Sequence, residues 1–357
     1  MFGGQPSITQ PSAFPWLSPK VVTLNILPNV FPDIINIFLL HYRQNIIYLL
    51  INLVGACINI PSITITYEYM DNYLSKTKKM ILSYWLYIVP HHLMSRFTYI
   101  ITRTHHPLTQ YLIKLYIRIF KINLKECEEE KIENYHTFCD FFTRKLKKGV
   151  HKIHEDDDSI VSSCDGRILQ FGKITNQSIL QVKGKNTPIN ELLVNDKELS
   201  SIYANGSFLT IYLSPKDYHR VHIPFSGKLM KTLHVPGRLF SVADHAVECI
   251  NNLYSKNERL VCHFKNDDSF FSVILVGAIN VSSIETQWKG EVSPPMPKKV
   301  ITTKYGNKNI SFDKGNEIGM FKSGSTVILL FTDKVNLSED LKINQAIRVG
   351  EKIGIKI

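Results

Sequence analysis

The stretch KGNEIGMFKSGSTVILLF, Lys314–Phe331, decides the fold of the C-terminal part of this chain. Its first eleven residues contain three glycines, and its last six, TVILLF, favour extended structure. A short apolar run bounded by turn signals is typical of a β-strand. We therefore predict a strand over 326–331, directly after the Gly-Ser step formed by Gly324 and Ser325.

The same alternation of strand and turn signals continues throughout the chain after Val150. Glycine and proline, which often interrupt regular structure, punctuate the runs. The runs are SILQVKG (178–184), SFLTIYL (207–213), FFSVILVGAI (270–279), TVILLF (326–331) and AIRVGEKIGIKI (346–357). Residues 151–357 are therefore predicted to form a β-rich domain.

The preceding part of the chain has helical and basic character. Residues 71–150 contain 14 Lys or Arg against 7 Asp or Glu. In LTQYLIKLYIRIFKI (108–122), apolar side chains recur at helical spacing and basic side chains fall mostly elsewhere around the helix. Such a helix suits a membrane surface, and an ordinary core-facing helix explains the pattern equally well. We predict a helical membrane-associating region over 61–150, and hence an α+β fold: a helical, basic, membrane-facing N-terminal region followed by the β-rich domain.

An apolar stretch, residues 34–60, precedes that region. A helix needs about 20 apolar residues to cross a bilayer, and the cleanest run, Ile46–Ile60, has 15. A membrane anchor, an interfacial helix and a buried core helix all remain open. Residues 1–33 are rich in proline and contain one Lys and no Arg, a poor match to a mitochondrial transit peptide. We predict an unstructured or targeting leader over 1–33 and favour membrane contact over 34–60.

The net charge of +11 restricts the class of partner. A basic surface attracts nucleic acid or an anionic membrane, and the sequence contains none of the common nucleic-acid recognition motifs. The six cysteines have no CxxC spacing, so neither a zinc knuckle nor a thioredoxin-like site is indicated. Of the two partners we expect an anionic membrane surface and no nucleic acid, and a basic face that is simply solvated remains open on charge alone.

Four parts of the sequence contain groups suited to chemistry. Each is a weak signal alone, because an aspartate before glycine is usually a turn residue and one histidine pair lacks the further ligands that a metal needs. They are SSCDGRIL with Asp165, YLSPKDYHRVHIPF with His219 and His222, PGRLFSVADHAV with the later VGAINVSSI, and KGNEIGMFKSGSTVILLF with Ser325.

In this order, the segments resemble those of the phosphatidylserine decarboxylases. The resemblance extends from about Trp85 to the C-terminus and includes FFTRKLKKG, Phe141–Gly149, which is similar to that family's FFxR motif. The DYHRVHIP and Gly-Ser-Thr segments are its most specific parts. The sequence departs from the family pattern at Ser323, where an apolar residue is usual, and at Ser282, where glycine is usual.

The resemblance implies a proenzyme that cuts itself between Gly324 and Ser325. Asp165, His222 and Ser325 match the family's self-cleaving triad, in which a base activates the serine hydroxyl and an acid group orients the base. His219 matches the histidine that the family uses in decarboxylation. We expect it to act as an acid or base with a near-neutral pKa.

The implied cofactor is a pyruvoyl group made from Ser325. This group would accept electrons, as pyridoxal phosphate does in other decarboxylases. We expect neither pyridoxal phosphate nor a metal. The large chain would be 1–324 and the small chain 325–357. Phosphatidylserine at an anionic membrane would be converted to phosphatidylethanolamine, and a homodimer is left open. The endoplasmic reticulum is slightly favoured over the mitochondrial inner membrane, because an Arg-rich leader is missing.

Two other functions remain open on the sequence. A serine hydrolase would use the same Asp-His-Ser set on an external ester or peptide, although the GxSxG nucleophile elbow is missing. A non-processing lipid-binding homologue would keep the fold without cutting itself, although all four key residues are present. Only the second alternative predicts a chain that stays uncut.

Overall fold

The computed structural model describes residues 90–357 except 183–184, 268, 280–282, 295 and 323–324. The leader predicted over 1–33 and the apolar segment 34–60 lie outside these residues. The longer helices come first, and those among the strands are short. The helices are α3 (His91–Arg103), α4 (Thr109–Phe120), α5 (Phe138–Phe142), α6 (Ile189–Leu192), α7 (Lys197–Ile202), α8 (Asp244–Cys249) and α9 (Leu253–Lys256), with 3-10 turns η1 (Leu124–Glu126) and η2 (Ile132–Asn134).

Strands dominate the chain from residue 159 onwards, which confirms the predicted β-rich character. Each of the five predicted runs contains at least one strand. The strands are β1 (Ser159–Val161), β2 (Gly166–Lys173), β3 (Ser178–Val182), β4 (Lys185–Pro188), β5 (Ser207–Leu213), β6 (Arg220–His222), β7 (Gly227–Val235), β8 (Arg259–Asn266), β9 (Ser269–Val276), β10 (Ile284–Thr286), β11 (Gly290–Ser293), β12 (Ile301–Lys304), β13 (Ser311–Phe312), β14 (Glu317–Phe321), β15 (Ser325–Phe331), β16 (Val335–Leu337), β17 (Ala346–Ile347) and β18 (Lys352–Lys356).

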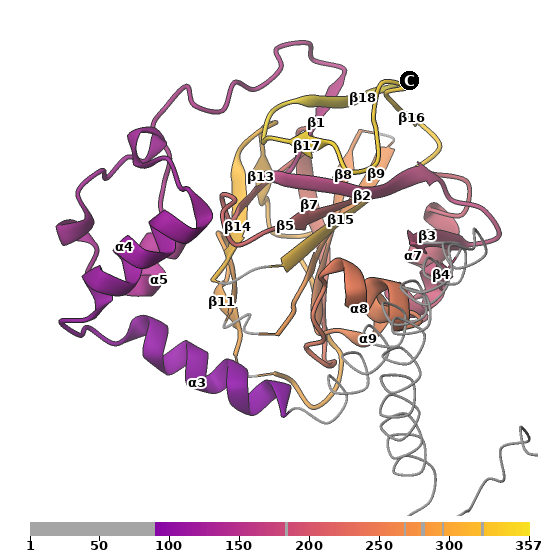
Figure 1. The fold of residues 1–357 in the computed structure, drawn as a ribbon. Coiled ribbons are helices and arrows are strands. Elements are labelled where there is room, and N and C mark those ends of the chain that lie inside the picture. Colours follow the sequence, from indigo (N-terminus) through magenta and orange to yellow (C-terminus); the bar gives the residue numbers. More distant parts are fainter. Residues whose placement is uncertain (1–89, 183–184, 268, 280–282, 295, 323–324) are drawn as a thin grey trace, which may run out of the picture. The chain divides into compact units, whose positions relative to one another are not determined.

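The largest sheet in the described residues has nine strands. Its order is β12-β7-β8-β9-β15-β5-β2-β17, and β13 also pairs with β7. Smaller sheets have the orders β11-β10-β14-β6, β1-β18-β16 and β3-β4. Figure 1 shows α3, α4 and α5 grouped on one side of the strands. Within the described residues, these three helices are therefore separate from the sheets.

β15 lies in the interior of the large sheet, between β5 and β9. Its residue Leu329 pairs with Leu209 of β5 and Val273 of β9, and every residue of β15 is buried. A strand with neighbours on both sides and both faces covered reads as a continuous apolar run. This explains the sequence VILLF and fixes Ser325 at the start of a central strand.

The helical part has its own small apolar cluster. Ile113 of α4 is buried against Tyr135 and Phe141 in this cluster, so the helix predicted within 108–122 is confirmed and one face of it is packed. α5 starts with a reciprocal capping box, in which Thr137 and Asp140 each accept a backbone N–H of the other residue. The cap stabilises a helix of only five residues next to the sheets.

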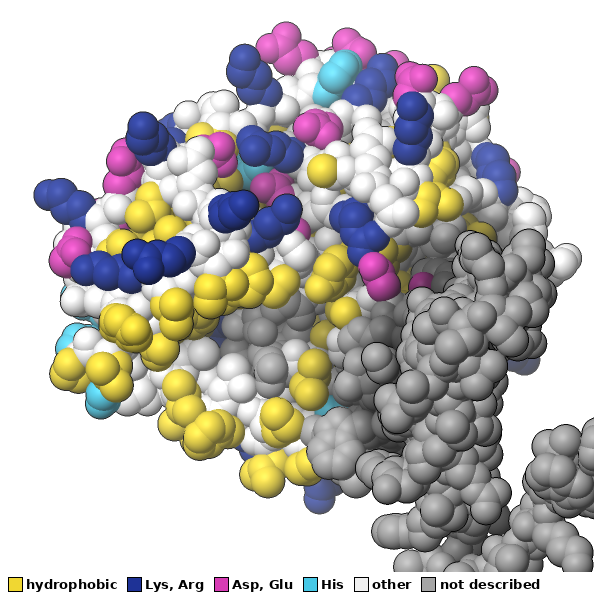
Figure 2. All heavy atoms as spheres, in the orientation of Figure 1, with side chains coloured by type: hydrophobic (Ala, Val, Ile, Leu, Met, Phe, Trp, Pro, Cys, Tyr) yellow, Lys and Arg dark blue, Asp and Glu magenta, His cyan; other side chains and the backbone are white. Residues whose placement is uncertain are grey.

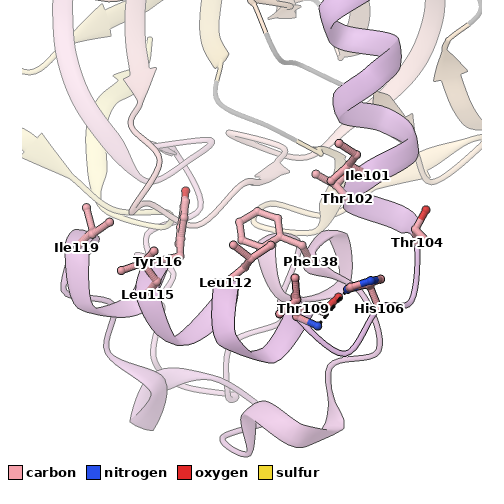
Figure 3. Close-up of a pocket in the computed structure, with 11 residues that line it drawn as sticks. Ile101, Thr102, Thr104, His106, Thr109, Leu112, Leu115, Tyr116, Ile119 and Phe138 are labelled. Atoms are coloured by element: carbon pink, nitrogen blue, oxygen red, sulfur yellow. Dashed lines mark hydrogen bonds between the residues drawn. The ribbon is translucent and has the colours of Figure 1, made fainter.

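The other face of α3 and α4 is apolar and exposed. Figure 2 shows hydrophobic side chains gathered in bands over this part of the surface. The exposed residues are Leu93, Met94, Phe97, Ile100, Ile101, Leu108, Tyr111, Leu112, Leu115 and Ile119. Between the two helices lies a groove of about 590 Å³ (Figure 3). No helix in the described part of the chain is both long and apolar enough to cross a bilayer.

Candidate active site

The strand order brings the predicted site residues to one end of neighbouring strands. Ser325 opens β15 opposite Leu213, the last residue of β5. Asp165 directly precedes β2, which pairs with the other side of β5. After β5 the chain passes through residues 214–219, ending at His219, into β6, which carries His222.

Ser325 is a buried residue whose hydroxyl is unpaired within the described structure. The residue is fully buried, and its Oγ has no hydrogen-bond partner among the described residues. A buried hydroxyl without a partner costs free energy, so most are paired in folded proteins. An unpaired one is expected where the hydroxyl reacts. Gly324, the other half of the predicted cleavage site, lies outside the described residues.

His222 is held in the tautomer that a base requires. Its Nδ1 lies 2.8 Å from the carbonyl oxygen of Gly315, so Nδ1–H donates there and Nε2 keeps a lone pair. Nε2 lies 3.3 Å from Tyr218 Oη. Burial lowers the pKa of His222, while the Gly315 hydrogen bond and the charge of Glu317 oppose this shift. The ring is therefore neutral at pH 7.

Asp165 is anchored by a different pair of groups. Its Oδ1 accepts the N–H of Val349 at 2.8 Å and lies 2.8 Å from His151 Nε2. Within the described structure, Asp165 and His222 thus hydrogen-bond to other groups, although the charge of Asp165 still acts on His222. The relay from Asp165 through His222 to Ser325 stays a prediction.

His219 is the most deeply buried titratable group of the site. Its Nδ1 lies 2.8 Å from the carbonyl oxygen of Asp217, and its Nε2 has no partner among the described residues. Burial lowers the pKa of His219 to about 3. The expected near-neutral pKa was therefore wrong. Removing the charged ring from water costs more free energy than its hydrogen bond to the Asp217 carbonyl restores.

The FFxR-like segment supports the loop that holds His219. The ring of Phe142 lies 4.2 Å from that of His219, centroid to centroid. Arg144 Nη2 donates to the carbonyl oxygen of Lys216 at 3.1 Å, and Arg220 donates to the carbonyl oxygen of Thr143 from Nε at 3.0 Å and Nη2 at 2.8 Å. Two motifs that are distant in sequence therefore form one structural unit.

Three further residues complete the site and were not singled out from the sequence. Glu317, paired with His222 across β6 and β14, accepts from Arg220 Nη1 at 2.8 and 3.0 Å. Tyr218 lies inside the DYHRVHIP motif, which was a signal for it. His151 lies in a connecting segment where nothing in the local pattern marks it. Among the described residues, no hydrogen bond joins Ser325 Oγ to His219, His222 or Asp165.

Comparison with known proteins names the family. The model for phosphatidylserine decarboxylase matches residues 138–355. The phosphatidylserine decarboxylase proenzyme of Methylococcus capsulatus is 44% identical over 246 residues, covering 69% of this chain and 85% of the relative. That of Alkalilimnicola ehrlichii is 44% identical over 247 residues (69% and 86%), and that of Alcanivorax borkumensis is 41% identical over 272 (75% and 93%). The chain belongs to the phosphatidylserine decarboxylase family.

Proposed function

We propose that this chain cuts itself between Gly324 and Ser325 and then decarboxylates phosphatidylserine to phosphatidylethanolamine. Membership of the family supports the reaction, and the similar proteins carry the name proenzyme. The two products of the cut would be residues 1–324 and 325–357. Because β15 pairs with β5 and β9 over its whole length, the small chain would stay bound after the cut.

The observation that carries the proposal is the hydroxyl of Ser325. It is buried and has no partner among the described residues, at the start of a central strand, with the two histidines of the site held neutral by burial. A neutral imidazole that comes within hydrogen-bond distance of such a hydroxyl can accept its proton. The serine is therefore suited to conversion into a pyruvoyl group.

The proposed cut is an acyl shift followed by elimination. His222 Nε2 accepts the proton of Ser325 Oγ, and Oγ bonds to the carbonyl carbon of Gly324. The peptide C–N bond then breaks, which leaves an ester and a free amine on Ser325. Loss of the Cα proton expels the Gly324 carboxylate and leaves dehydroalanine. Water converts this to a pyruvoyl group and ammonia, so no outside oxidant is needed.

In the mature enzyme, the pyruvoyl group would supply a carbonyl that binds the substrate amine and accepts electrons as carbon dioxide leaves. His219 offers the lone pair of Nε2, which has no partner in the described structure. Burial keeps the ring neutral until a substrate carboxylate lies beside it and raises its pKa. We propose that His219 takes up and returns a proton at Nε2.

The apolar face of α3 and α4 supports a lipid substrate. Figure 3 shows the groove with α3 side chains on one side and α4 side chains on the other. Tyr116 lines this groove, and its Oη donates to the carbonyl oxygen of Pro215 at 2.7 Å. Pro215 lies in the loop that leads to His219. We propose that this face lies on an anionic membrane, with the acyl chains of the substrate nearest the groove.

Intact mass spectrometry tests the proposed cut directly. We expect a fragment that starts at residue 325, has a blocked N-terminus and carries a pyruvoyl group in place of Ser325. Ser325→Ala should give one uncut chain of about the full 41.0 kDa and release no carbon dioxide from phosphatidylserine. A wild-type chain that stays uncut with anionic vesicles would support the non-processing alternative. Efficient cutting of Ser325→Ala would refute the serine mechanism.

A further inference from the structure

His151 contacts the acid group of the proposed triad. Its Nε2 lies 2.8 Å from Asp165 Oδ1, with the two side chains only 11% and 16% exposed. The two atoms lie within contact distance, but the contact does not meet hydrogen-bond geometry, and His151 Nε2 has no hydrogen-bond partner among the described residues. Val349 donates its backbone N–H to the same oxygen. One carboxylate oxygen of Asp165 is therefore held from two sides, and Oδ2 takes part in neither contact.

The segment that carries His151 is fixed against both supports of the triad. Two residues later, Ile153 packs so closely on Gly315 and Gly350 that a Cβ at either glycine would lie 2.8 Å from its Cδ1. Both glycines have positive φ, +78° and +88°, so the site already favours residues without a side chain. Gly315 accepts the hydrogen bond of His222, and Gly350 follows the residue that donates to Asp165.

The ring of His151 also reaches the base of the triad indirectly. It lies 5.1 Å from the ring of Tyr218, centroid to centroid, and Tyr218 Oη lies 3.3 Å from His222 Nε2. His151 thus lies against Asp165 with its ring nitrogen and beside Tyr218 with its ring, at an interplanar angle of 51°. Two separate properties of the side chain are involved: a nitrogen that can donate and a flat ring that packs.

We propose that His151 is a positioning residue for self-processing, which acts by holding the carboxylate of Asp165 in place for His222. This rests on the proposed function, because it assigns Asp165 to the cut. The nitrogen of His151 is the part that matters in this role. The packing of its ring on Tyr218 is secondary.

Two substitutions separate the nitrogen from the ring. His151→Phe keeps a flat ring on Tyr218 and loses the donor, whereas His151→Gln keeps an N–H donor and loses the ring. Loss of a polar contact to a carboxylate slows a step that depends on the position of that carboxylate by roughly tenfold. We expect His151→Phe to slow self-cleavage by at least that factor, and His151→Gln to stay within about threefold of wild type.

The measurement is the fraction of cut chain over time after a pulse of cell-free synthesis, which does not depend on decarboxylation. The control is His154→Phe, since His154 makes a longer and more exposed contact, 3.6 Å to Asp156. Thermal unfolding of each variant in the Ser325→Ala background checks that the fold is retained.

The outcomes distinguish this inference from the proposed function. If wild type fails to cut, the proposed function itself fails. If wild type cuts and His151→Phe cuts equally fast, His151 does not position Asp165. If His151→Gln cuts slowly and His151→Phe cuts fast, His151 acts through the packing of its ring on Tyr218. That result would overturn the inference.

Discussion

At the scale of single residues, the two histidines of DYHRVHIP are expected to have separable roles. His222→Ala should block self-cleavage, because it removes the only proposed acceptor for the Ser325 proton. His219→Ala should still cut but lose turnover, because its Nε2 is proposed to act on substrate. Gel analysis of cutting and release of carbon dioxide from labelled phosphatidylserine report the two steps separately. The reverse pattern would exchange the two assignments.

The sequence revealed these residues far better than it revealed their surroundings. Asp165, His219, His222 and Ser325 all lie in short motifs, so local sequence was enough to name them. The low pKa of His219 was not predictable, because it depends on burial by Phe142 and neighbouring groups from elsewhere in the chain. His151 was missed for the same reason: its contact with Asp165 exists only in the folded chain.

At the scale of elements, the exposed face of α3 and α4 should govern membrane binding. Phe97 and Ile119 are 66% and 60% exposed. Replacing both by Asp removes apolar surface and adds repulsion from an anionic bilayer, so affinity should fall by at least about tenfold. Flotation with phosphatidylserine-containing vesicles measures this.

A matched control lies on the β-rich part of the chain. Ile343 is 51% exposed, and Ile343→Asp changes charge and hydrophobicity in the same way at a single position away from the helices. It should leave vesicle binding within about twofold, because a scattered apolar residue is normal on a protein surface. If the control and the helix variant lose vesicle affinity equally, α3 and α4 do not form the membrane-binding surface.

The central strand β15 should be the element least tolerant of change. Leu329 is fully buried between β5 and β9, so Leu329→Ala leaves a cavity and should lower the free energy of unfolding by about 2–5 kcal/mol. Urea unfolding of the uncut Ser325→Ala chain measures the loss. Ile355→Ala in β18, where the side chain is 44% exposed, should cost much less. Similar losses at both positions would contradict the central place of β15.

The sequence predicted which segments form strands, but it did not predict which strands pair with one another. Apolar runs identified β5, β9 and β15 because these strands are buried, while the short β6 and β14 gave no such signal. Yet β6 and β14 place His222 opposite Glu317 and lead the chain to Ser325. Short strands are specified by neighbours distant in sequence, which a local pattern does not contain.

At the scale of the whole molecule, the helical part and the sheets meet at the loop of residues 214–219. Tyr116 of α4, Phe142 of α5 and Arg144 each contact residues 215–219 from the helical side. On the other side, the loop follows directly from β5, which pairs with β15. The helical part and the strand that begins with Ser325 are thus joined through one short segment, residues 214–219.

The buried histidines also predict how the whole fold responds to acid. Burial lowers the pKa of His219 to about 3 and that of His263 to about 4, while an unfolded histidine titrates near 6.5. Between these values the unfolded chain binds more protons, so stability is fully present above about pH 6.5 and falls as the pH drops. Lowering the pH from 7.5 to 5.5 should reduce the free energy of unfolding by about 1.4 kcal/mol for each such histidine.

His263 allows the effect to be isolated, because it lies away from the serine, bonded to Tyr203 and Ser272. We expect the free energy of unfolding to fall between pH 7.5 and 5.5 in both chains. In His263→Phe, made in the uncut Ser325→Ala chain, the fall should be smaller by about 1.4 kcal/mol. Comparing urea unfolding at the two pH values cancels any constant effect of the new side chain. His222 has a lowered pKa as well and adds in the same direction in both chains. An unchanged pH dependence in His263→Phe would mean that His263 is protonated in the folded state at pH 5.5, against the burial that the structure gives it.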